Sequence, residues 1–445
     1  MIESLRTWAL LRSLRSGGHR SPRSLEVLQA ELLRGTLAYA YQSIPFYRRV
    51  WDEEGFHPTQ VREVGDLARV PILAGPVMRD AVARGELLAR DVDPRETTSY
   101  DSSGSSGRPL KVLRRTLEQR LWRAVGLRVW FEHGFRWRDR TVQFDSEASP
   151  PHFLQRFGIS HTTWISNDRL ITERLTDLVE AKAQIIVGTP TALRRISEAM
   201  HTAGATIPRP RIVICPGEVL DAETRRIVEQ AFGVAPVGLY GMTEVGYVAW
   251  QCERREGFHE NAETCLVEVL REGRGVDPGE LGAIVVTDLR SRTMPLIRYD
   301  TGDLGLAANG PCPCGRQGPL VGAIEGRARE ALRLPDGRIL TRRWIVDQLN
   351  GFPRLGEYRL HQETPSRFRL ALGQRGTNDS GGAESQRSAR EDEAKVLSRL
   401  RDVLGRVEII VEPGRFRVSG NSVKTNPISS DLAPPFAAGR EPVRA

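Results

Sequence analysis

A run with helical spacing followed at once by a short apolar run stands at residues 168–190, "DRLITERLTDLVEAKAQIIVGTP". The second part indicates a short buried strand that ends in a Gly-Thr-Pro turn. The same alternation continues through "RIVICPGE", "AETRRIVEQAFG", "VGLYGMTE" and "GAIVVTDL". This pattern predicts an α/β fold over about residues 95–290, with helices on the faces of a sheet. Because such sheets bind ligands outside the carboxyl ends of their strands, we expect the chemistry at the sharp turns that follow them.

Composition excludes several classes of protein. The chain has 445 residues, of which 40% are hydrophobic and 27% charged, so it is large enough for two or three domains with cores of their own. No stretch reaches the length of a membrane span, and Arg and Ser interrupt the first twenty residues too often for a secretory signal. We therefore expect a cytoplasmic protein with no membrane partner. The net charge of +8 comes from scattered basic residues, offset by 56 acids and without a basic stripe, so we expect no nucleic-acid partner.

The character of the sequence changes near residue 326, where "LRLPDGRIL" predicts a hairpin that opens a smaller α+β unit. We therefore expect a large N-terminal domain at 1–326 and a small C-terminal domain at 327–431. Within the small domain, residues 374–392 are polar, rich in Gly and Ser and without an apolar period, which predicts a disordered insertion. The tail, 432–445, is also expected to be disordered.

Residues 99–112, "SYDSSGSSGRPLKV", place serines and glycines ahead of a basic residue and a proline. A glycine-punctuated loop lets successive backbone N–H groups turn inward around an anion, and serine hydroxyls add further donors. The alternative is a flexible turn, since Ser/Gly runs are usually unstructured. The run is not the GxxxxGK[ST] loop, so by itself it does not decide between the two. The candidate phosphate-binding residues are Ser102, Ser103, Gly104, Ser105, Ser106, Gly107 and Arg108.

Three further segments follow this loop: "GLYGMTEVG" at 238–246, "PLIRYDTGDLG" at 295–305 and "EGRARE" at 325–330. In this order and at this spacing, the four segments resemble those of the adenylate-forming, acyl-CoA synthetase-like superfamily. Within it, "LAYAYQSIPFYRRVWDEEGFHP", "PGEVL", "CPCGR" and "LPDGR" are similar to the phenylacetate-CoA ligase family, so the resemblance covers about residues 25–430. It implies a large N-terminal domain of mixed sheets flanked by helices, and a small, mobile α+β C-terminal domain.

By this resemblance, the Ser/Gly loop would hold the β- and γ-phosphates of ATP, with Arg108 where the family usually has lysine. Tyr240 would stack on adenine, Thr243 would bind the α-phosphate, and Glu244 would ligate Mg²⁺, a hard cation that prefers oxygen ligands. Asp303 would accept hydrogen bonds from both ribose hydroxyls, and the alternative for it is a turn residue after a strand. Further nucleotide contacts would come from Gly217, Glu218, Gly241, Met242 and Arg327.

The catalytic lysine of adenylation must be one of four lysines in the chain. Lys424 alone stands in a Gly/Ser-bounded turn near the end of the small domain, so we predict that it acts with Thr243 and Glu244. A solvated surface lysine is the alternative, and the motif departs from the relatives, which place glycine immediately before the lysine. Where many members carry acidic residues just beyond the boundary arginine, this chain has Arg329 and Glu330, so the resemblance does not identify the hinge.

Three cysteines and a histidine have the types and spacing of a metal site. Cys252 and His259 are separated by six residues, and Cys312 and Cys314 by one. Three thiolates and one imidazole suit tetrahedral Zn²⁺, and four protein ligands would make the site closed and structural. The alternative is a set of buried thiols beside a surface histidine. The two other cysteines lie in apolar runs and are expected in the core: Cys215 and Cys265.

The resemblance implies that the protein activates a carboxylic acid with ATP to an acyl-AMP, releases pyrophosphate and passes the acyl group to coenzyme A. It also implies an aromatic acid, whose pocket would be lined by a segment containing Phe144, Phe153 and Trp164. Two alternatives stay open: an adenylating enzyme whose acceptor is an amine or a carrier-protein thiol, and a zinc-stabilised binding protein without catalysis. The expected partners are the acid, ATP and coenzyme A, and a homodimer stays open.

Overall fold

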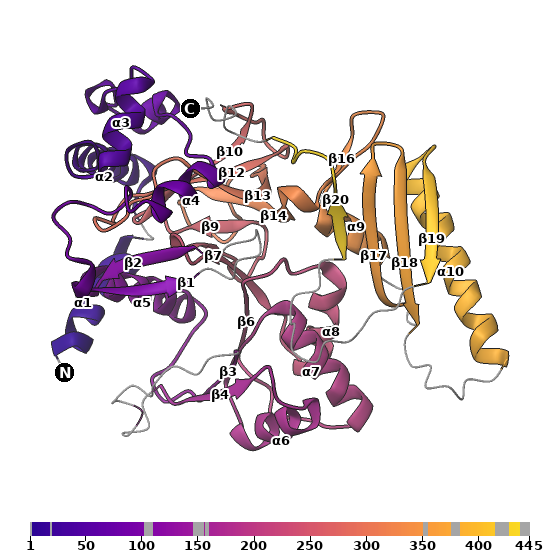
Figure 1. Ribbon diagram of the computed structural model, residues 1–445. Coiled ribbons are helices and arrows are strands. Elements are labelled where there is room, and N and C mark those ends of the chain that lie inside the picture. Colours follow the sequence, from indigo (N-terminus) through magenta and orange to yellow (C-terminus); the bar gives the residue numbers. More distant parts are fainter. Residues whose placement is uncertain are drawn as a thin grey trace.

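Figure 1 shows the computed structural model, which describes residues 2–17, 20–101, 110–145, 155, 160–349, 355–374, 383–413 and 427–436. The described elements form a large unit and a smaller unit that has a sheet of its own. No helix among these residues is both long and apolar enough to cross a membrane. The helices of the large unit are α1 (Ile2–Gly17), α2 (Pro22–Ser43), α3 (Pro45–Glu53), α4 (Gly75–Ala83), α5 (Thr116–Glu132), α6 (Ile171–Ala181), α7 (Pro190–Ala203) and α8 (Ala222–Phe232).

A twelve-stranded sheet runs through the large unit in the order β11-β10-β12-β13-β14-β9-β8-β7-β6-β5-β3-β4. The strands from β4 to β7 pair in parallel, and those from β7 to β11 pair antiparallel. The predicted α/β class with a mixed sheet is therefore confirmed. The strand bounds are β3 (Thr141–Asp145), β4 (Thr162–Ser166), β5 (Ile185–Val187), β6 (Ile212–Pro216), β7 (Val237–Met242), β8 (Gly246–Trp250), β9 (Phe258–Glu260), β10 (Cys265–Arg271), β11 (Arg274–Gly275), β12 (Leu281–Asp288), β13 (Tyr299–Ala307) and β14 (Leu320–Arg327).

The parallel strands are buried on both faces, which explains why their sequences are continuous apolar runs. Successive side chains of a strand point to opposite faces. Ile185 packs in a cluster with Val129 of α5, whereas its neighbour Ile186 packs in another cluster with Leu193 of α7 and Val228 of α8. Helices therefore cover both faces of the parallel half, and the turns at the carboxyl ends of its strands remain available for ligands.

The smaller unit starts directly after β14. Strands β15 (Leu332–Arg333) and β16 (Ile339–Leu340) pair antiparallel, which confirms the hairpin predicted from "LRLPDGRIL". A four-stranded sheet in the order β19-β18-β17-β20 has its own core with α9 and α10. The domain boundary at residues 326 and 327 agrees with this division and stays a prediction. The bounds are α9 (Arg342–Leu349), β17 (Leu355–Thr364), β18 (Arg367–Gln374), α10 (Ala383–Leu404), β19 (Glu408–Pro413) and β20 (Ile428–Ser430).

The structure differs from the sequence prediction at the two segments expected to be disordered. Helix α10 begins at Ala383, so residues 383–392 are helical, and the rest of the predicted insertion beyond Gln374 lies outside the described residues. This segment lacks an apolar period but is rich in Ala, Glu, Gln and Arg, which favour helices. Residues 432–436 of the tail also have defined contacts, and the residues beyond them are not described.

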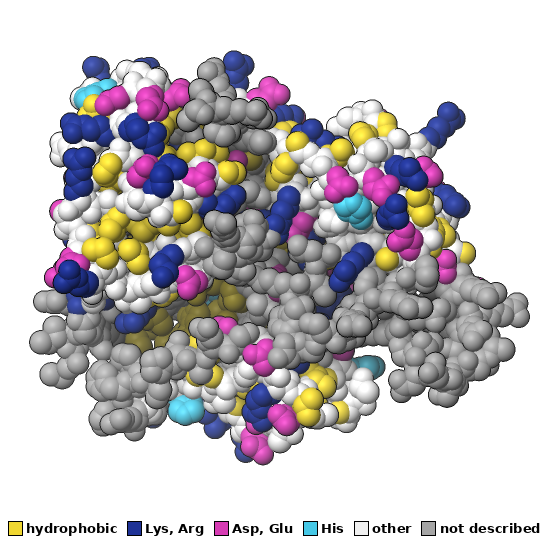
Figure 2. Space-filling view, in the orientation of Figure 1, with side chains coloured by type: hydrophobic (Ala, Val, Ile, Leu, Met, Phe, Trp, Pro, Cys, Tyr) yellow, Lys and Arg dark blue, Asp and Glu magenta, His cyan; other side chains and the backbone are white. Residues whose placement is uncertain are grey.

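Charged side chains of both signs are interspersed on the face shown in Figure 2. Over the described residues of this face, the basic side chains form no continuous stripe. This distribution agrees with the scattered charges of the sequence.

Candidate functional site

A cavity of about 380 Å³ opens between the large sheet and the start of the smaller unit. Its walls come from the turn after β6, from β7, β13 and β14, and from the start of α9. The fold therefore brings together segments that are more than 100 residues apart in the sequence. Six of the predicted nucleotide-binding residues line this cavity: Gly217, Glu218, Tyr240, Gly241, Asp303 and Arg327.

The turn after β6 presents Glu218 to the cavity. Gly217 has φ +82°, a backbone conformation that favours glycine, and it allows the chain to reverse directly after the strand. Glu218 Oε2 accepts hydrogen bonds from the backbone N–H and the hydroxyl of Thr191, at 3.1 and 2.6 Å. The other carboxylate oxygen, Oε1, is buried and has no hydrogen-bond partner among the described residues. The cavity wall therefore carries one acceptor that a ligand could satisfy.

Asp303 is the centre of a small polar cluster at the cavity. The carboxylate is 7% exposed, accepts from the Tyr240 hydroxyl at 2.9 Å and lies 3.2 Å from Arg327 Nε. Strand pairing explains this, because Asp303 on β13 lies directly opposite Arg327 on β14. Burial raises the pKa of Asp303, while the positive charge of Arg327 opposes the shift. Burial also holds the pKa of Tyr240 well above its usual value, so this hydroxyl remains a donor.

The geometry leaves Asp303 with unused acceptor capacity. A carboxylate has about four lone-pair positions, of which Tyr240 and Arg327 occupy one each. Arg327 is fixed in turn, because its Nη1 donates to the backbone oxygen of Thr301 at 2.9 Å. The cluster can therefore accept hydrogen bonds from a ligand without losing the contacts that hold it.

The turn between β7 and β8 carries Thr243 and Glu244, both half-buried. Arg114 Nη2 donates to the backbone oxygens of these two residues, at 2.8 and 2.9 Å, and Trp122 Nε1 donates to that of Val245 at 2.9 Å. Both donors come from the segment after the Ser/Gly loop, and burial lowers the pKa of Arg114 to about 10. The turn is thus held through its backbone, which leaves the Thr243 and Glu244 side chains available for ligands. Neither side chain is among those lining the cavity, and Met242, predicted to contact the nucleotide, packs against the core.

Packing also explains the glycine that ends this turn. Gly246 has φ +98°, and a Cβ there would lie 2.3 Å from Trp122 Nε1. No other residue fits without moving the indole ring. Sequence reasoning missed Arg114 and Trp122, because their role depends on contacts with a turn more than 120 residues away and no local pattern marks them.

The predicted phosphate loop and the predicted catalytic lysine lie outside the described residues. The loop, Ser102–Arg108, joins strands β1 (Thr97–Asp101) and β2 (Lys111–Arg115), which pair antiparallel with Asp101 opposite Lys111. Strand β2 also carries Arg114, which holds the Thr243–Glu244 turn. Lys424 stands just before β20 in the sequence, and its role stays a prediction.

Arg342 and Arg343 extend the cavity wall from the smaller unit. Arg342 Nη1 lies 3.2 Å from Glu330, and Arg343 Nη1 lies 3.0 Å from Glu325 on β14. Thr341 also donates to Glu325, at 2.6 Å. Both units therefore close this site together. Sequence reasoning missed these two arginines. Because 60 of the 64 basic residues are arginine, nothing in the sequence distinguishes these two from the others.

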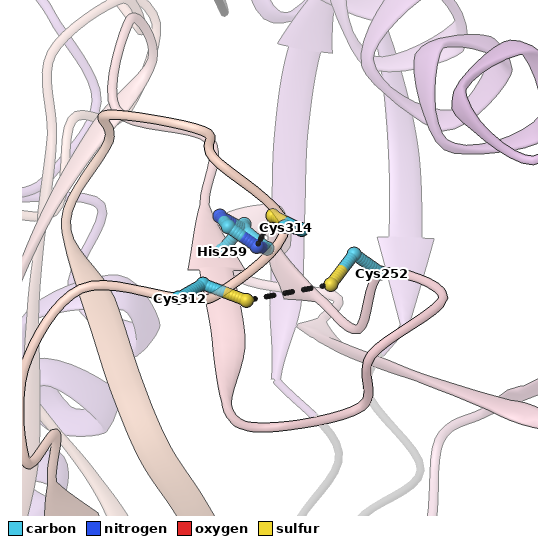
Figure 3. Close-up of side chains that lie close together, drawn as sticks. All are labelled: Cys252, His259, Cys312 and Cys314. Carbon is cyan, nitrogen blue, oxygen red and sulfur yellow. Dashed lines mark hydrogen bonds between the residues drawn. The ribbon is translucent and has the colours of Figure 1, made fainter.

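The three cysteines and the histidine of the predicted metal site lie close together, as Figure 3 shows. Cys252 Sγ lies 3.6 Å from Cys312 Sγ, Cys314 Sγ lies 3.3 Å from His259 Nε2, and all four ligand atoms lie within 4.8 Å of one another. A tetrahedral ion with metal–sulfur bonds near 2.3 Å would have ligand–ligand distances of about 3.8 Å, close to those observed. The donor set and its spacing therefore fit a four-coordinate ion.

His259 is suited to this role because it is 4% exposed rather than at the surface, as the alternative required. Burial and, to a smaller extent, the nearby charge of Arg316 lower its pKa to about 4, so the imidazole is neutral and its nitrogen can bind a metal. Cys215 and Cys265 are buried in the core, as expected from the sequence.

Comparison with known proteins agrees with this site. Residues 156–288 match the family model for AMP-binding enzymes. The chain is 29% identical over 327 residues to a phenylacetate-coenzyme A ligase of Thermus thermophilus, covering 69% of this chain and 71% of the relative. A phenylacetate-coenzyme A ligase of Aromatoleum evansii is 27% identical over 296 residues, covering 63% and 66%. The fold also matches 2-hydroxyisobutyryl-CoA ligase in its postadenylation state, with a TM-score of 0.75 and 21% identity over 93% of this chain and 91% of that one.

The fold and the AMP-binding match define the class: the chain is similar to the adenylate-forming, acyl-CoA synthetase-like superfamily. Within it, four curated relatives are phenylacetate-CoA ligases, and the resemblance predicted from the sequence is thereby confirmed. The predicted enzyme class, an AMP-forming acid–thiol ligase, is confirmed by the same matches.

Proposed function

We propose that this protein uses ATP to convert a carboxylic acid to an acyl-AMP, with release of pyrophosphate, and then transfers the acyl group to coenzyme A. The observation that carries the proposal is the cluster of Tyr240, Asp303 and Arg327 at a cavity shared by both units. A buried carboxylate with free acceptor positions suits the two hydroxyls of a ribose. The unpaired Glu218 Oε1 at the same cavity would accept from the exocyclic amine of adenine.

The two reactions require positioning and neutralisation of charge rather than covalent chemistry by the protein. We assign binding of the β- and γ-phosphates to Ser102–Arg108, and contact with the α-phosphate to Thr243. Lys424 would neutralise the charge that gathers on the bridging oxygens as the acid attacks. Glu244 would hold Mg²⁺, which supplies positive charge to the phosphates when bound.

We also propose a structural zinc ion at Cys252, His259, Cys312 and Cys314. The ligand distances and the neutral imidazole support it, as does the closed set of four protein ligands. The ion would connect the loop after β8 to the loop between β13 and β14, and so support the strands that carry the nucleotide site. No catalytic step is assigned to it.

An aromatic acid is supported by the names of the four curated relatives. The aromatic residues expected in its pocket need a correction. Phe144 is 2% exposed and packs in the core with Leu193, so it is a structural residue. Trp164 lies half-buried on the edge strand β4, and Phe153 lies outside the described residues. The homodimer and the cytoplasmic location stay predictions.

An ATP–pyrophosphate exchange screen over aryl and alkyl acids tests the proposal. We expect exchange with at least one aryl acid, and release of AMP that depends on added coenzyme A. Exchange without coenzyme A-dependent AMP release, but with release on adding an amine or a carrier protein, would identify a different acceptor. No exchange with any acid, together with no ATP binding in calorimetry, would favour the binding protein without catalysis.

A further inference from the structure

The last described residues return from the smaller unit to the junction between the two units. Strand β20 ends at Ser430, and the N–H of Asp431 donates to the oxygen of Gln362 on β17 at 2.9 Å. Five residues later the chain lies against the large sheet, where the Arg271 guanidinium of β10 is 5.1 Å from the centre of the Phe436 ring. Figure 1 shows this segment in yellow, running past β16 toward β10. Residues 431–436 therefore span both units, and we call them the strap.

Phe436 packs on the connection between the units. Its ring joins a cluster with Leu304 of β13, with Ala328, the first residue of the short 3₁₀ helix between β14 and β15, and with Ala331, which follows that helix. Ile339 of the smaller unit and Leu281 of β12 complete this cluster. Phe436 thus belongs to a cluster whose members come from the large sheet, the connecting segment and the smaller unit.

The strap is held along its length. Arg333 Nη2 of β15 donates to the oxygen of Pro434 at 3.2 Å, and Pro435 is buried. Two consecutive prolines restrict the backbone and make the strap stiff. Phe436 has φ +58°, a conformation that is uncommon for a residue other than glycine and persists where surrounding contacts fix it.

The strap is too short to keep both attachments if the smaller unit turns. Five peptide units from Asp431 to Phe436 span at most about 18 Å when fully extended. A large rotation about the connecting segment would carry Asp431 away with β20 while Phe436 stayed on the large sheet. One attachment must therefore break, and the ring of Phe436, which is half-buried, is the weaker one.

We propose that the strap holds the smaller unit closed over the nucleotide site, and that Phe436 must leave its cluster before the smaller unit can turn for acyl transfer. The closed arrangement is the one seen here, because Arg342 and Arg343 of the smaller unit line the same cavity as Asp303. The inference rests on the proposed two-step function. Phe436 is a positioning residue, since it contacts neither the cavity nor the nucleotide residues.

Limited trypsin digestion of the ligand-free protein tests the strap without any assay of activity. Arg329 lies in the 3₁₀ helix of the connection, between Ala328 and Ala331 of the Phe436 cluster, so Phe436→Ala should be cleaved there faster than wild type, by about 5- to 30-fold. Phe436→Leu, which keeps an apolar contact, should restore much of the protection. The matched control is Val411→Ala, an exposed apolar residue on β19 that should digest like wild type.

The second measurement separates the half-reactions. In Phe436→Ala, the rate of acyl-AMP formation should fall relative to the rate of acyl transfer from supplied acyl-AMP. The ratio of the first rate to the second should therefore decrease. Thermal unfolding shows whether the variant is folded, and a variant truncated after Asp431 should repeat the effect if Phe436→Ala does not fold. If both variants are as protected from trypsin as wild type and have the same ratio of half-reaction rates, the proposed role of the strap is wrong, even where pyrophosphate exchange supports the proposed function. If wild type shows no pyrophosphate exchange, the proposed function is refuted instead. The digestion experiment then still tests whether the strap holds the smaller unit.

Discussion

Replacement of Asp303 is the sharpest test of the nucleotide site, because its carboxylate has two known protein partners and spare acceptor positions. Asp303→Asn preserves the shape of the side chain and can still accept from Tyr240, now 2.9 Å away. It removes the negative charge that faces Arg327 at 3.2 Å and that would bind both ribose hydroxyls. Asp303→Ala removes all of these contacts, including the carboxylate that accepts from Tyr240, so the two variants give a lower and an upper limit of the effect.

The size of the effect follows from the hydrogen bonds to a charged acceptor. Such a bond contributes about 1.5 to 3 kcal/mol, so losing one should weaken ATP binding by roughly 10- to 150-fold. Acid preference should not change, because Asp303 lies in the nucleotide cavity. The ion pair with Arg327 adds little to this figure, since the arginine side chain is 41% exposed.

The assay compares ATP with its 2′-deoxy and 3′-deoxy analogues in calorimetry and in pyrophosphate exchange. Wild type should bind each analogue more weakly than ATP, whereas Asp303→Asn should discriminate less, because the acceptor of the missing hydroxyl has already been weakened. Asp277→Asn, an exposed acid between β11 and β12, is the matched control and should behave as wild type. If Asp303→Asn keeps both wild-type ATP affinity and full discrimination, this residue does not hold the ribose.

Three further predictions concern the metal, the lysine and pH. Purified protein should contain about one zinc per chain, and Cys312→Ser should lose metal and thermal stability together, because ligation contributes to folding; protein made with zinc available but free of zinc by elemental analysis would refute the site. Lys424→Ala should slow acyl-AMP formation by about 100- to 1,000-fold and largely spare thioester formation from supplied acyl-AMP. If the adenylation rate is unchanged, another cation neutralises the charge in this step, and Arg108 is the first candidate. ATP affinity should be retained above the pKa of Asp303 and lost as the pH falls through that pKa. Because burial raises the pKa of Asp303, this loss should begin at a higher pH than it would for an exposed aspartate. If ATP affinity depends on pH in Asp303→Asn as it does in wild type, this prediction is wrong.

The sequence predicted the site residues that belong to short continuous motifs. "PGE", "YGM" and "TGD" each follow or lie in a buried strand, and the fold brings Gly217, Tyr240 and Asp303 to one cavity. Cysteine and histidine are rare in this chain, so their spacing was informative, and the four ligands do meet. These residues lie together because local pattern and tertiary position coincide there, and their roles stay predictions.

Other features depend on contacts that no local pattern records. Arg114 fixes the Thr243–Glu244 turn across more than 120 residues, and nothing distinguishes its sequence from that of many other arginines. Phe144 could have faced a pocket or the core, since an apolar residue suits both, and the structure places it in the core. Residues 383–392 lack an apolar period but contain good helix formers, so composition misled the prediction of disorder.

Strand β14 links the metal cluster to the nucleotide cluster, so the proposed zinc ion can stabilise the nucleotide site without contacting it. His259 on β9 lies opposite Leu320, the first residue of β14, and the last residue of β14 is Arg327, opposite Asp303. Register errors in a sheet displace every side chain along the strand, so whatever fixes one end of β14 also fixes the other. The pairing of β13 with β14 contains two irregularities, between Leu304 and Gly305 and between Leu306 and Ala307, where the register could otherwise slip. An ion that joins the loop before β14 to β9 would remove that freedom, and the Asp303–Arg327 pair would then depend on a metal it never contacts.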